Sequence, residues 1–245
     1  MSAPLVLIHG LFQMLDGLDA EKQLAPRPVL IPDLPGYGRN REAVEVSLPA
    51  AVDYVHSTIL AAGFSGAHVV GHSIGGAVAV LLARRYPEVV RSVINVEGNF
   101  TLKDAFWSRR IAEMGASDAE SLLDADRTDP AGWLSRAGID PTAERIALAT
   151  LGLNAQPPST VQRMARSVVA ITAEPAYLED VRVALDRGVP FHLFAGERSL
   201  AGWDVPAFVA ERARSMTVQP GVGHMMMLEN ALEFFRLVAG LLPPE

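Results

Sequence analysis

The sequence is most informative at Val69-Val70-Gly71-His72-Ser73-Ile74-Gly75-Gly76, where a serine stands between glycines in the order G-x-S-x-G. A β-branched pair opens this stretch, and the helix-forming run of residues 77–83 follows it. The order of strand, sharp turn and helix is that of a nucleophile elbow, in which the serine hydroxyl is exposed above a sheet. Glycines suit such a turn because it brings backbone segments close together. The pattern therefore predicts a nucleophilic Ser73 and places the amide of Ile74 beside its hydroxyl.

Length, charge and cysteine content narrow the class of protein. The 245 residues, 49% hydrophobic and 20% charged, can bury a substantial core as one domain with an inserted segment. A formal net charge of −7 leaves no basic stripe to neutralise phosphates, so we expect no nucleic-acid partner. The lack of cysteine excludes disulfides, a thiolate nucleophile and Cys-ligated zinc. No leader peptide and no apolar run of membrane-spanning length is evident, so we expect a cytoplasmic protein without a membrane span.

Short apolar runs alternate with helical patterns over the rest of the chain. Buried strands are predicted at residues 4–8, 29–31, 67–71, 91–96, 189–195 and 216–218. Helices are predicted at residues 16–24, 50–62, 205–213 and 228–241. Strands that alternate with helices are typical of α/β proteins, so we expect a doubly wound, mostly parallel sheet of about six strands.

Residues 100–186 have a different character, because helical segments broken by glycine and proline fill the interval between two strands. We expect this segment to form a helical lid over the carboxyl edge of the sheet, inserted into a core made of residues 1–99 and 187–245. Its large side chains are candidates for a substrate pocket: Phe106, Trp107, Trp133, Met164 and Tyr177. Packing of the lid against the core explains each of them equally well.

The loops after the first two predicted strands are rich in glycine. The first strand ends in His9-Gly10-Leu11-Phe12, and the glycine lets the next amides turn towards the crevice at the strand ends. We assign the amide of Leu11, with that of Ile74, to an oxyanion hole, and Phe12 is a weaker candidate donor. The second loop, residues 33–38, has the order D-x-P-G-x-G, and we expect its Asp33 to bind loop amides.

Taken together, these motifs resemble the α/β-hydrolase family. The His-Gly strand end, the D-x-P-G-x-G turn, the G-H-S-I-G-G elbow and Gly223-His224 occur in the family's order and spacing. The resemblance covers essentially the whole chain and implies the α/β-hydrolase fold. The two antiparallel strands that lead the family's sheet have no room here, because only a few residues precede the His-Gly strand.

The resemblance also implies a catalytic base, which a serine hydroxyl needs near neutral pH. His224 lies in a glycine-rich loop after the last predicted strand, where the family places its histidine. His9 and His72 flank the glycines of the two turns, and we expect them to brace the site through hydrogen bonds. The other histidines are expected inside strands or on a surface helix: His68, His192 and His56.

The usual acid of the family is missing. Members usually carry aspartate three residues after the glycine that ends the penultimate strand. Here that glycine is Gly196, and the position holds Ser199. Because serine has no charge to orient an imidazolium, we expect replacement of Ser199 by alanine to matter little.

Three carboxylates could replace that aspartate. Glu97 ends the strand after the elbow helix, an acid position that some family members use, and we assign it as the acid. Glu197 and Asp204 are the alternatives. A buried carboxylate needs a partner, so a purely structural ion pair of Glu97 with Arg109 or Arg110 also stays open.

The combined pattern predicts a cofactor-free serine hydrolase that cleaves a carboxylic ester, thioester or lactone through an acyl-enzyme on Ser73. We expect a small-molecule acyl substrate, no metal or other cofactor, and a monomer or homodimer. The candidate pocket residues are Phe12, His72, Phe106, Trp107, Trp133 and Met225. Two other functions stay open: a cofactor-independent ring-cleaving dioxygenase of the same fold, and a ligand-binding protein with little turnover.

Overall fold

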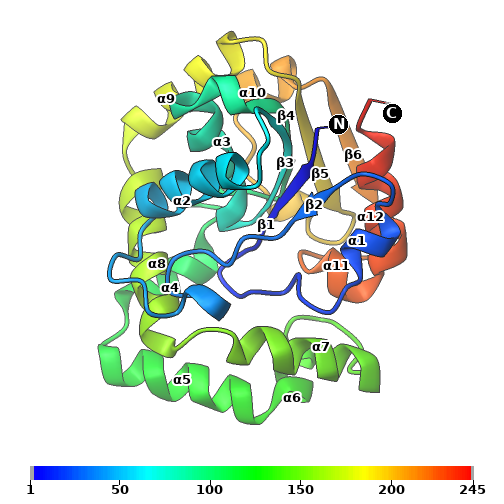
Figure 1. Cartoon of the computed structure of the whole chain (residues 1–245). Helices are drawn as coiled ribbons and strands as arrows, with labels where there is room; N and C mark the ends of the chain where they lie inside the picture. Colours follow the sequence, from blue (N-terminus) through cyan, green and yellow to red (C-terminus); the bar gives the residue numbers. More distant parts are fainter. Residues whose placement is uncertain (1–2, 244–245) are drawn as a thin grey trace.

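The computed structural model describes residues 3–243. Within these residues, one sheet contains six parallel strands in the order β2-β1-β3-β4-β5-β6 (Figure 1). The strands are β1 (Leu5–Ile8), β2 (Val29–Leu30), β3 (Ala67–His72), β4 (Val90–Val96), β5 (Phe191–Gly196) and β6 (Ser215–Gln219). The prediction of a parallel, six-stranded α/β sheet is confirmed.

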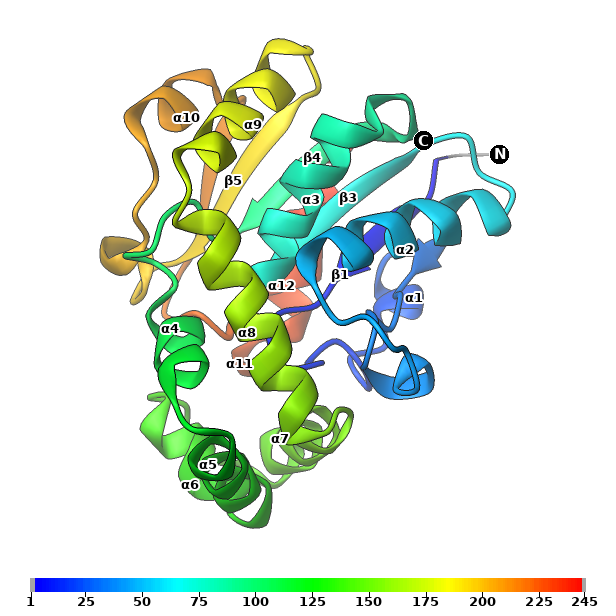
Figure 2. The ribbon, with the colours of Figure 1, turned by 90° about the vertical axis from the view of Figure 1, so that its left-hand side faces the viewer.

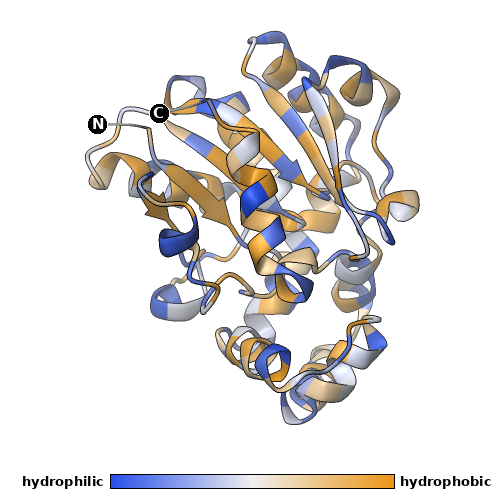
Figure 3. Cartoon of the chain, turned by 90° about the vertical axis from the view of Figure 1, so that its right-hand side faces the viewer, coloured by the Kyte–Doolittle hydropathy of each residue, from blue (hydrophilic) through white to orange (hydrophobic). Residues whose placement is uncertain are grey.

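The inner strands are buried, as their continuous apolar sequences predict. Every residue of β1, β3 and β5 is buried, and in β4 Arg91 alone is exposed. Orange predominates along these strands in Figure 3, although blue segments interrupt it. Edge strand β6 instead exposes Met216 and Val218. Parallel pairing brings the carboxyl ends together, so that Gly71 of β3 pairs with Ile8 of β1 and with Asn95 of β4.

Helices cover both faces of the sheet. One face carries α2 (Leu48–Ala61), α3 (Ile74–Arg85), α9 (Pro175–Asp186) and α10 (Ala207–Arg212), and Figure 2 shows α2, α3 and α9 side by side. The opposite face carries α1 (Ala20–Gln23), α11 (Met226–Glu229) and α12 (Ala231–Gly240) (Figure 1). Each face has its own cluster of buried apolar side chains. The hydrophobic core therefore lies in two layers on either side of the strands.

The segment between β4 and β5 is helical. It contains α4 (Phe106–Glu113), α5 (Ala116–Thr128), α6 (Pro130–Arg136), α7 (Ala143–Asn154), α8 (Pro158–Thr172) and α9. Side chains cap two of these helices, because Asp129 accepts a hydrogen bond from the Gly132 amide at 2.9 Å and Thr142 one from the Arg145 amide at 3.3 Å. Helices α5 to α7 lie beyond the carboxyl ends of the strands, whereas α9 returns to pack on α3 (Figures 1 and 2).

Two of the predicted helices differ in extent. The helix predicted at residues 228–241 is divided into α11 and α12, because Asn230 interrupts it and its side chain accepts a hydrogen bond from the Glu233 amide at 3.1 Å. The helix predicted at residues 16–24 is shortened to α1, and Asp19 before it has the left-handed φ of 51°.

Two candidate pocket residues belong to the core instead. Met164 of α8 and Tyr177 of α9 are fully buried in the apolar cluster between the helices and the sheet. The Tyr177 hydroxyl donates a hydrogen bond to the carbonyl oxygen of Asn99 at 2.8 Å. Of the two alternatives that the sequence left open for these side chains, pocket lining is wrong, and packing against the sheet explains both.

Candidate active site

Ser73 occupies a strained turn between β3 and α3. Its φ of 54° and ψ of −120° lie in a region that residues other than glycine rarely adopt. The turn is tight enough that a Cβ at Gly71 would lie 2.1 Å from the carbonyl oxygen of Gly75. A Cβ at Gly75 would lie 2.4 Å from the carbonyl oxygen of Ile8. Both positions therefore require glycine. The backbone can form this tight turn because the sequence has glycine at both.

Backbone hydrogen bonds tie this turn to the end of β4. The Ser73 amide donates to the carbonyl oxygen of Val96 at 3.0 Å, and the Ser73 carbonyl accepts from the Gly76 amide at 2.9 Å. The same carbonyl accepts from the Asn99 amide at 3.3 Å. The serine is therefore fixed relative to the strand that carries Glu97.

The end of β1 lies against the serine. A Cβ at Gly10 would lie 3.3 Å from the Ser73 Cβ and 2.9 Å from His72 Nδ1. The following residue, Leu11, lines a cavity together with Ser73, and its carbonyl oxygen accepts a hydrogen bond from the Tyr37 hydroxyl at 3.1 Å. This bond fixes one side of the Leu11 peptide unit. Ile74 is the first residue of α3, so its amide belongs to the helix N-terminus, where backbone N–H groups favour negative charge.

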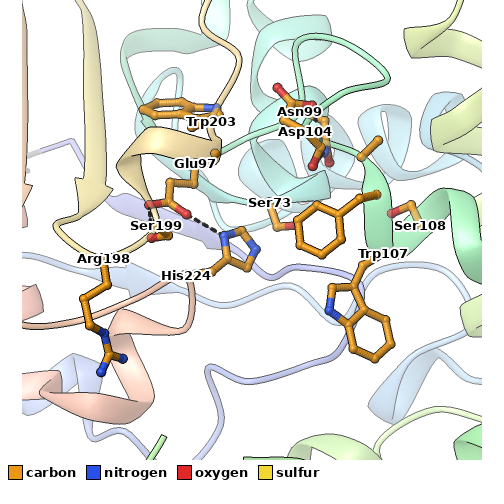
Figure 4. A pocket seen from close by; sticks show the side chains of 13 residues that line it. Ser73, Glu97, Asn99, Asp104, Trp107, Ser108, Arg198, Ser199, Trp203 and His224 are labelled. Atoms are coloured by element: carbon orange, nitrogen blue, oxygen red, sulfur yellow. Dashed lines mark hydrogen bonds and ion pairs between the residues drawn. The ribbon is translucent and has the colours of Figure 1, made fainter. Parts of the chain in front are cut away.

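His224 and Glu97 are in direct contact. Nδ1 of His224 lies 2.6 Å from Oε2 of Glu97, and the side chain of Glu97 is 4% exposed. In Figure 4 the imidazole ring lies between the Glu97 carboxylate and Ser73. Ser73, Glu97 and His224 come from β3–α3, β4 and the loop after β6, and parallel pairing brings these strand ends to one edge.

The other oxygen of Glu97 is held by β5. Oε1 accepts a hydrogen bond from the Gly196 amide at 2.8 Å and one from the Ser199 hydroxyl at 2.5 Å. Burial alone would raise the pKa of Glu97, but the hydrogen bond and charge of His224, together with the Ser199 and Gly196 bonds, outweigh it and lower the pKa. Glu97 is therefore a carboxylate at neutral pH and accepts the Nδ1 proton of His224.

The alternative carboxylates have other partners. Glu197 accepts a hydrogen bond from the Gly221 amide at 2.8 Å through Oε2. Asp204 accepts one from the Thr101 hydroxyl at 2.7 Å and lies 3.6 Å from the Lys103 ammonium.

The two arginines weighed as partners of Glu97 also bind elsewhere. Arg109 pairs with Glu113 at 3.4 Å, and the Arg110 guanidinium lies 5.8 Å from the centre of the Trp107 ring. The arrangement in the structure thus favours Glu97 over the other two carboxylates as the partner of His224.

Two further histidines, His72 and His9, lie beside the site. His72 Nε2 donates a hydrogen bond to the backbone oxygen of His224 at 2.9 Å. Burial and the neighbouring His224 hold the pKa of His72 well below its usual range, so its ring is neutral. His9 Nδ1 donates to the Gly10 carbonyl at 2.8 Å, and its Nε2 accepts from the Leu34 amide at 3.3 Å. Burial lowers the pKa of His9 to about 4. Both rings hold loops in place, as expected.

The remaining histidines lie away from the serine. His68 and His192, in strands, bind Ser92 and Ser215 at 2.7 and 2.8 Å. The ring of His56 on α2 stacks on Tyr86, with 3.8 Å between the ring centres.

Two cavities of about 290 Å³ each meet at Ser73 and His224. They share a wall made of Phe106, Trp107 and Ser108 from α4. The first, called here the polar cavity, is also lined by Glu97, Asn99, Asp104, Ala105, Arg198, Ser199, Gly202 and Trp203 (Figure 4). The second, the apolar cavity, is also lined by Gly10, Leu11, Phe12, His72, Trp133, Arg136, Ala137 and Met225.

The apolar cavity brings the candidate pocket residues together. Its lining includes all six: Phe12, His72, Phe106, Trp107, Trp133 and Met225. Phe12 and Trp133 meet edge to face, with 5.9 Å between the ring centres. Phe106 is 66% exposed and Trp107 36%, so these two lie at the rim rather than in the interior. An apolar group attached to a reacting carbonyl would fit beside Leu11 in this cavity.

The polar cavity contains residues that the sequence analysis did not identify. Asp104 accepts hydrogen bonds from the Phe100 amide at 3.0 Å and from the Thr101 amide at 3.4 Å. Burial raises the pKa of Asp104 to about 6, although these bonds act in the opposite direction. Arg198 pairs with Glu229 at 2.5 Å. An aspartate four residues after Phe100 in a short polar loop was the available sequence signal for the Asp104 turn.

Comparison with known proteins identifies the family of the chain. A model described as the alpha/beta hydrolase family matches residues 5–237. The chain belongs to the α/β-hydrolase family.

Similar proteins include two lipases and an esterase. Lipase 1 from Psychrobacter immobilis is 36% identical over 118 residues, which are 44% of this chain. The match spans 34% of the length of that lipase, about a third. Lipase LipV from Mycobacterium tuberculosis is 28% identical over 193 residues, 68% of this chain and 74% of the relative. The solved structure of a thermophilic esterase from Thermogutta terrifontis has the same fold, with a TM-score of 0.72 and 20% identity over 98% of this chain and 89% of that one.

No helix within residues 3–243 is long and apolar enough to cross a membrane. Over the same range, no group of three or more His, Cys, Asp or Glu side chains could hold a metal ion.

Proposed function

We propose that this protein is a serine hydrolase that cleaves an ester bond of a small-molecule acyl substrate. The observation that carries the proposal is the contact of His224 Nδ1 with the buried Glu97 carboxylate at 2.6 Å, with the imidazole facing the elbow serine (Figure 4). The names of the similar lipases and the esterase support the same reaction class. Thioesters and lactones present the same acyl carbon and belong to the proposed range.

In the first step, Ser73 attacks the acyl carbon and forms the C–O bond of a tetrahedral intermediate. Nε2 of His224 takes the serine proton, and Glu97 stabilises the imidazolium through Nδ1. The amides of Leu11 and Ile74 donate hydrogen bonds to the oxyanion that forms from the carbonyl oxygen. His224 then gives its proton to the leaving oxygen or sulfur as the acyl bond breaks.

In the second step, water replaces the leaving group. His224 takes a proton from this water, whose oxygen attacks the acyl carbon of the ester on Ser73. Collapse of the second tetrahedral intermediate releases the carboxylic acid and returns the proton to Ser73. Every proton in this cycle moves through Nε2 of His224. The contact of Nδ1 with Glu97 keeps the imidazole ring in the tautomer that this requires.

The test is a screen of p-nitrophenyl esters, thioesters and lactones with the wild type, Ser73→Ala and His224→Ala. We expect each variant to lose about 10⁴-fold or more in kcat, because the two groups act as one unit. Mass spectrometry of the stopped reaction should show the acyl mass on the wild type and none on Ser73→Ala. Either variant retaining more than a tenth of wild-type activity would show that the assignment is wrong.

Two measurements, oxygen uptake and ester turnover, separate the two other functions that the sequence leaves open. A cofactor-independent dioxygenase would consume oxygen with a heteroaromatic substrate, which an oxygen electrode detects. A ligand-binding protein would bind esters without turnover, so multiple turnovers of any substrate in the screen would contradict it.

A further inference from the structure

Ser199 occupies the position at which this family usually has the acid, and its side chain contacts Glu97, the residue assigned as the acid here. Ser199, in the loop after β5, donates its hydroxyl proton to Oε1 of Glu97 at 2.5 Å. The other carboxylate oxygen, Oε2, accepts from His224 Nδ1 at 2.6 Å. One carboxylate therefore joins the serine of β5 to the histidine, and Figure 4 shows both contacts as dashed lines.

The side chain of a glutamate at position 97 must be held by more contacts than that of an aspartate would need. Its side chain has one more rotatable bond, so more conformers compete with the one that faces His224. The backbone of Glu97 has a φ of 42°, which is unfavourable for a residue other than glycine. Two donors, the Gly196 amide and the Ser199 hydroxyl, hold Oε1 and so leave Oε2 facing the imidazole.

We propose that Ser199 is a positioning residue, which holds the Glu97 carboxylate in the orientation that His224 requires. It acts through Glu97 and takes no part in bond making or breaking. The proposal rests on the proposed function, since it gives Ser199 a role in the same reaction. It also changes the expectation that serine at this position is unimportant, because the hydroxyl contacts the carboxylate itself.

The hydroxyl also affects the charge of the carboxylate. A donated hydrogen bond favours the ionised form, so its loss raises the pKa of Glu97. Because the proposed reaction requires the ionised carboxylate, the acidic limb of the kcat/KM profile then moves to higher pH. The other charged or titratable groups near the site, Arg198, Asp104, Asp204 and His72, are the same in all variants below and do not change the comparison.

The experiment compares Ser199→Ala with Ser199→Thr, which keeps the hydroxyl, and with Ser57→Ala as a matched control. Ser57 is an exposed serine of α2 whose hydroxyl donates to the Asp53 carbonyl at 2.9 Å. For Ser199→Ala we expect kcat to fall about tenfold or more with KM little changed, because a hydrogen bond to a charged group is lost. Ser199→Thr should recover most of kcat and the wild-type acidic limb. Ser57→Ala should match the wild type in both.

A double variant shows whether the effect passes through Glu97. In a Glu97→Ala background, the added Ser199→Ala change should alter the residual kcat by no more than about twofold, since the partner is already gone. An equal loss in both backgrounds, or a loss without movement of the acidic limb, would show that Ser199 does not act on Glu97.

The two proposals can fail separately. If Ser73→Ala abolishes turnover while Ser199→Ala keeps the wild-type kcat and acidic limb, the positioning role alone is wrong. If Ser73→Ala remains active, the proposed function is wrong, and the positioning role is overturned with it. Melting temperatures of all variants, measured at one pH, separate a loss of folding from a loss of catalysis.

Discussion

Two residues of the proposed catalytic group have left-handed backbone conformations. Ser73 has a φ of 54° and Glu97 a φ of 42°, and each directly follows the last residue of a parallel strand. Such conformations are unfavourable by about 1–3 kcal/mol each, so the surrounding structure must enforce them. The hydrogen bonds from the Ser73 amide to Val96 and from the Glu97 amide to Phe194 do so, at 3.0 Å each. Strain at two neighbouring strand ends is typical of a site where side chains are held for chemistry.

The first prediction concerns the charge of Glu97. Glu97→Gln keeps the size of the side chain but removes the charge, and its amide favours the wrong tautomer of His224. We expect kcat to fall by roughly 10⁴-fold with the fold intact, as in other Ser-His-carboxylate triads. The matched control is Glu197→Gln, since Glu197 is an exposed glutamate that binds the Gly221 amide. Its kcat should be close to wild type. A near-normal Glu97→Gln beside an inactive Glu197→Gln would reverse the assignment.

At this scale the sequence was informative where chemistry fixes the residue type. Serine between glycines and histidine after glycine can be recognised because few other residues meet those steric and chemical demands. Glu97 could be assigned over Glu197 because it ends a strand beside the elbow, and its 2.6 Å contact with His224 supports that assignment. Asp104 could not be placed from sequence, since its burial depends on the fold of the whole segment around it.

At the scale of elements, β4 and β5 are adjacent and parallel. Val96, the last residue of β4, pairs with Phe194 of β5, and β5 continues from there to Gly196, so both strands end at the same edge of the sheet. An acid on either strand end can therefore face the loop that carries His224. The contact between Glu97 of β4 and Ser199 after β5 is direct evidence that the two positions converge.

The second prediction follows from this convergence. In Glu97→Ala the histidine loses its carboxylate, and adding Ser199→Asp supplies one from the neighbouring strand. We expect the double variant to recover about tenfold or more of the kcat that Glu97→Ala loses, because the charge that stabilises the imidazolium is restored. A steady-state assay on the best ester measures this. A double variant no more active than Glu97→Ala would mean that the two strand ends are not interchangeable.

The strands and helices differ in how accurately the sequence predicts them. The buried strands were predicted closely because their continuous apolar runs have no other stable location in an α/β protein. The helix at residues 228–241 was predicted as one piece, since the apolar pattern continues through Asn230, and only the cap at that residue divides it. For Met164 and Tyr177 the sequence left a pocket and the core open as alternatives, because an apolar side chain in a helix does not show which neighbour covers it.

At the scale of the molecule, the helices beyond the strand ends create two cavities with different lining residues around one serine. Trp133 of α6 lines the apolar cavity, whereas Trp107 of α4 stands in the wall between the two. An ester has two parts on either side of the acyl carbon, and two cavities can receive them separately. The division between a core and a lid stays a prediction, but the cavity walls come from both parts of the chain.

The third prediction tests these walls. Trp133→Ala should change kcat/KM unequally across esters that differ in their apolar group, since one methylene in an apolar pocket changes the rate about tenfold or more. Trp107→Ala should alter selectivity for both halves of the ester. The measurement is kcat/KM over a matrix of acyl and alcohol groups. A uniform loss for every ester that follows a lowered melting temperature would show that these side chains only pack the helices.

The last prediction concerns the stability of the whole chain against pH. Burial raises the pKa of Asp104 to about 6, whereas in the unfolded chain the group titrates near the ordinary value of about 3.9. The folded state therefore holds a proton that the unfolded state has released between about pH 4 and pH 6. The contribution of this group to the free energy of unfolding falls as pH rises through that window, by at most about 1.4 kcal/mol per pH unit.

Asp104→Asn cannot titrate, so its stability relative to the wild type should rise from pH 4 to pH 6 and then level off. The lowered pKa of Glu97 has the opposite effect, because its contribution is lost as pH falls, but Glu97 is present in both proteins and cancels in their difference. Urea denaturation of both proteins at each pH measures that difference, and a difference that stays constant with pH would show that Asp104 titrates normally.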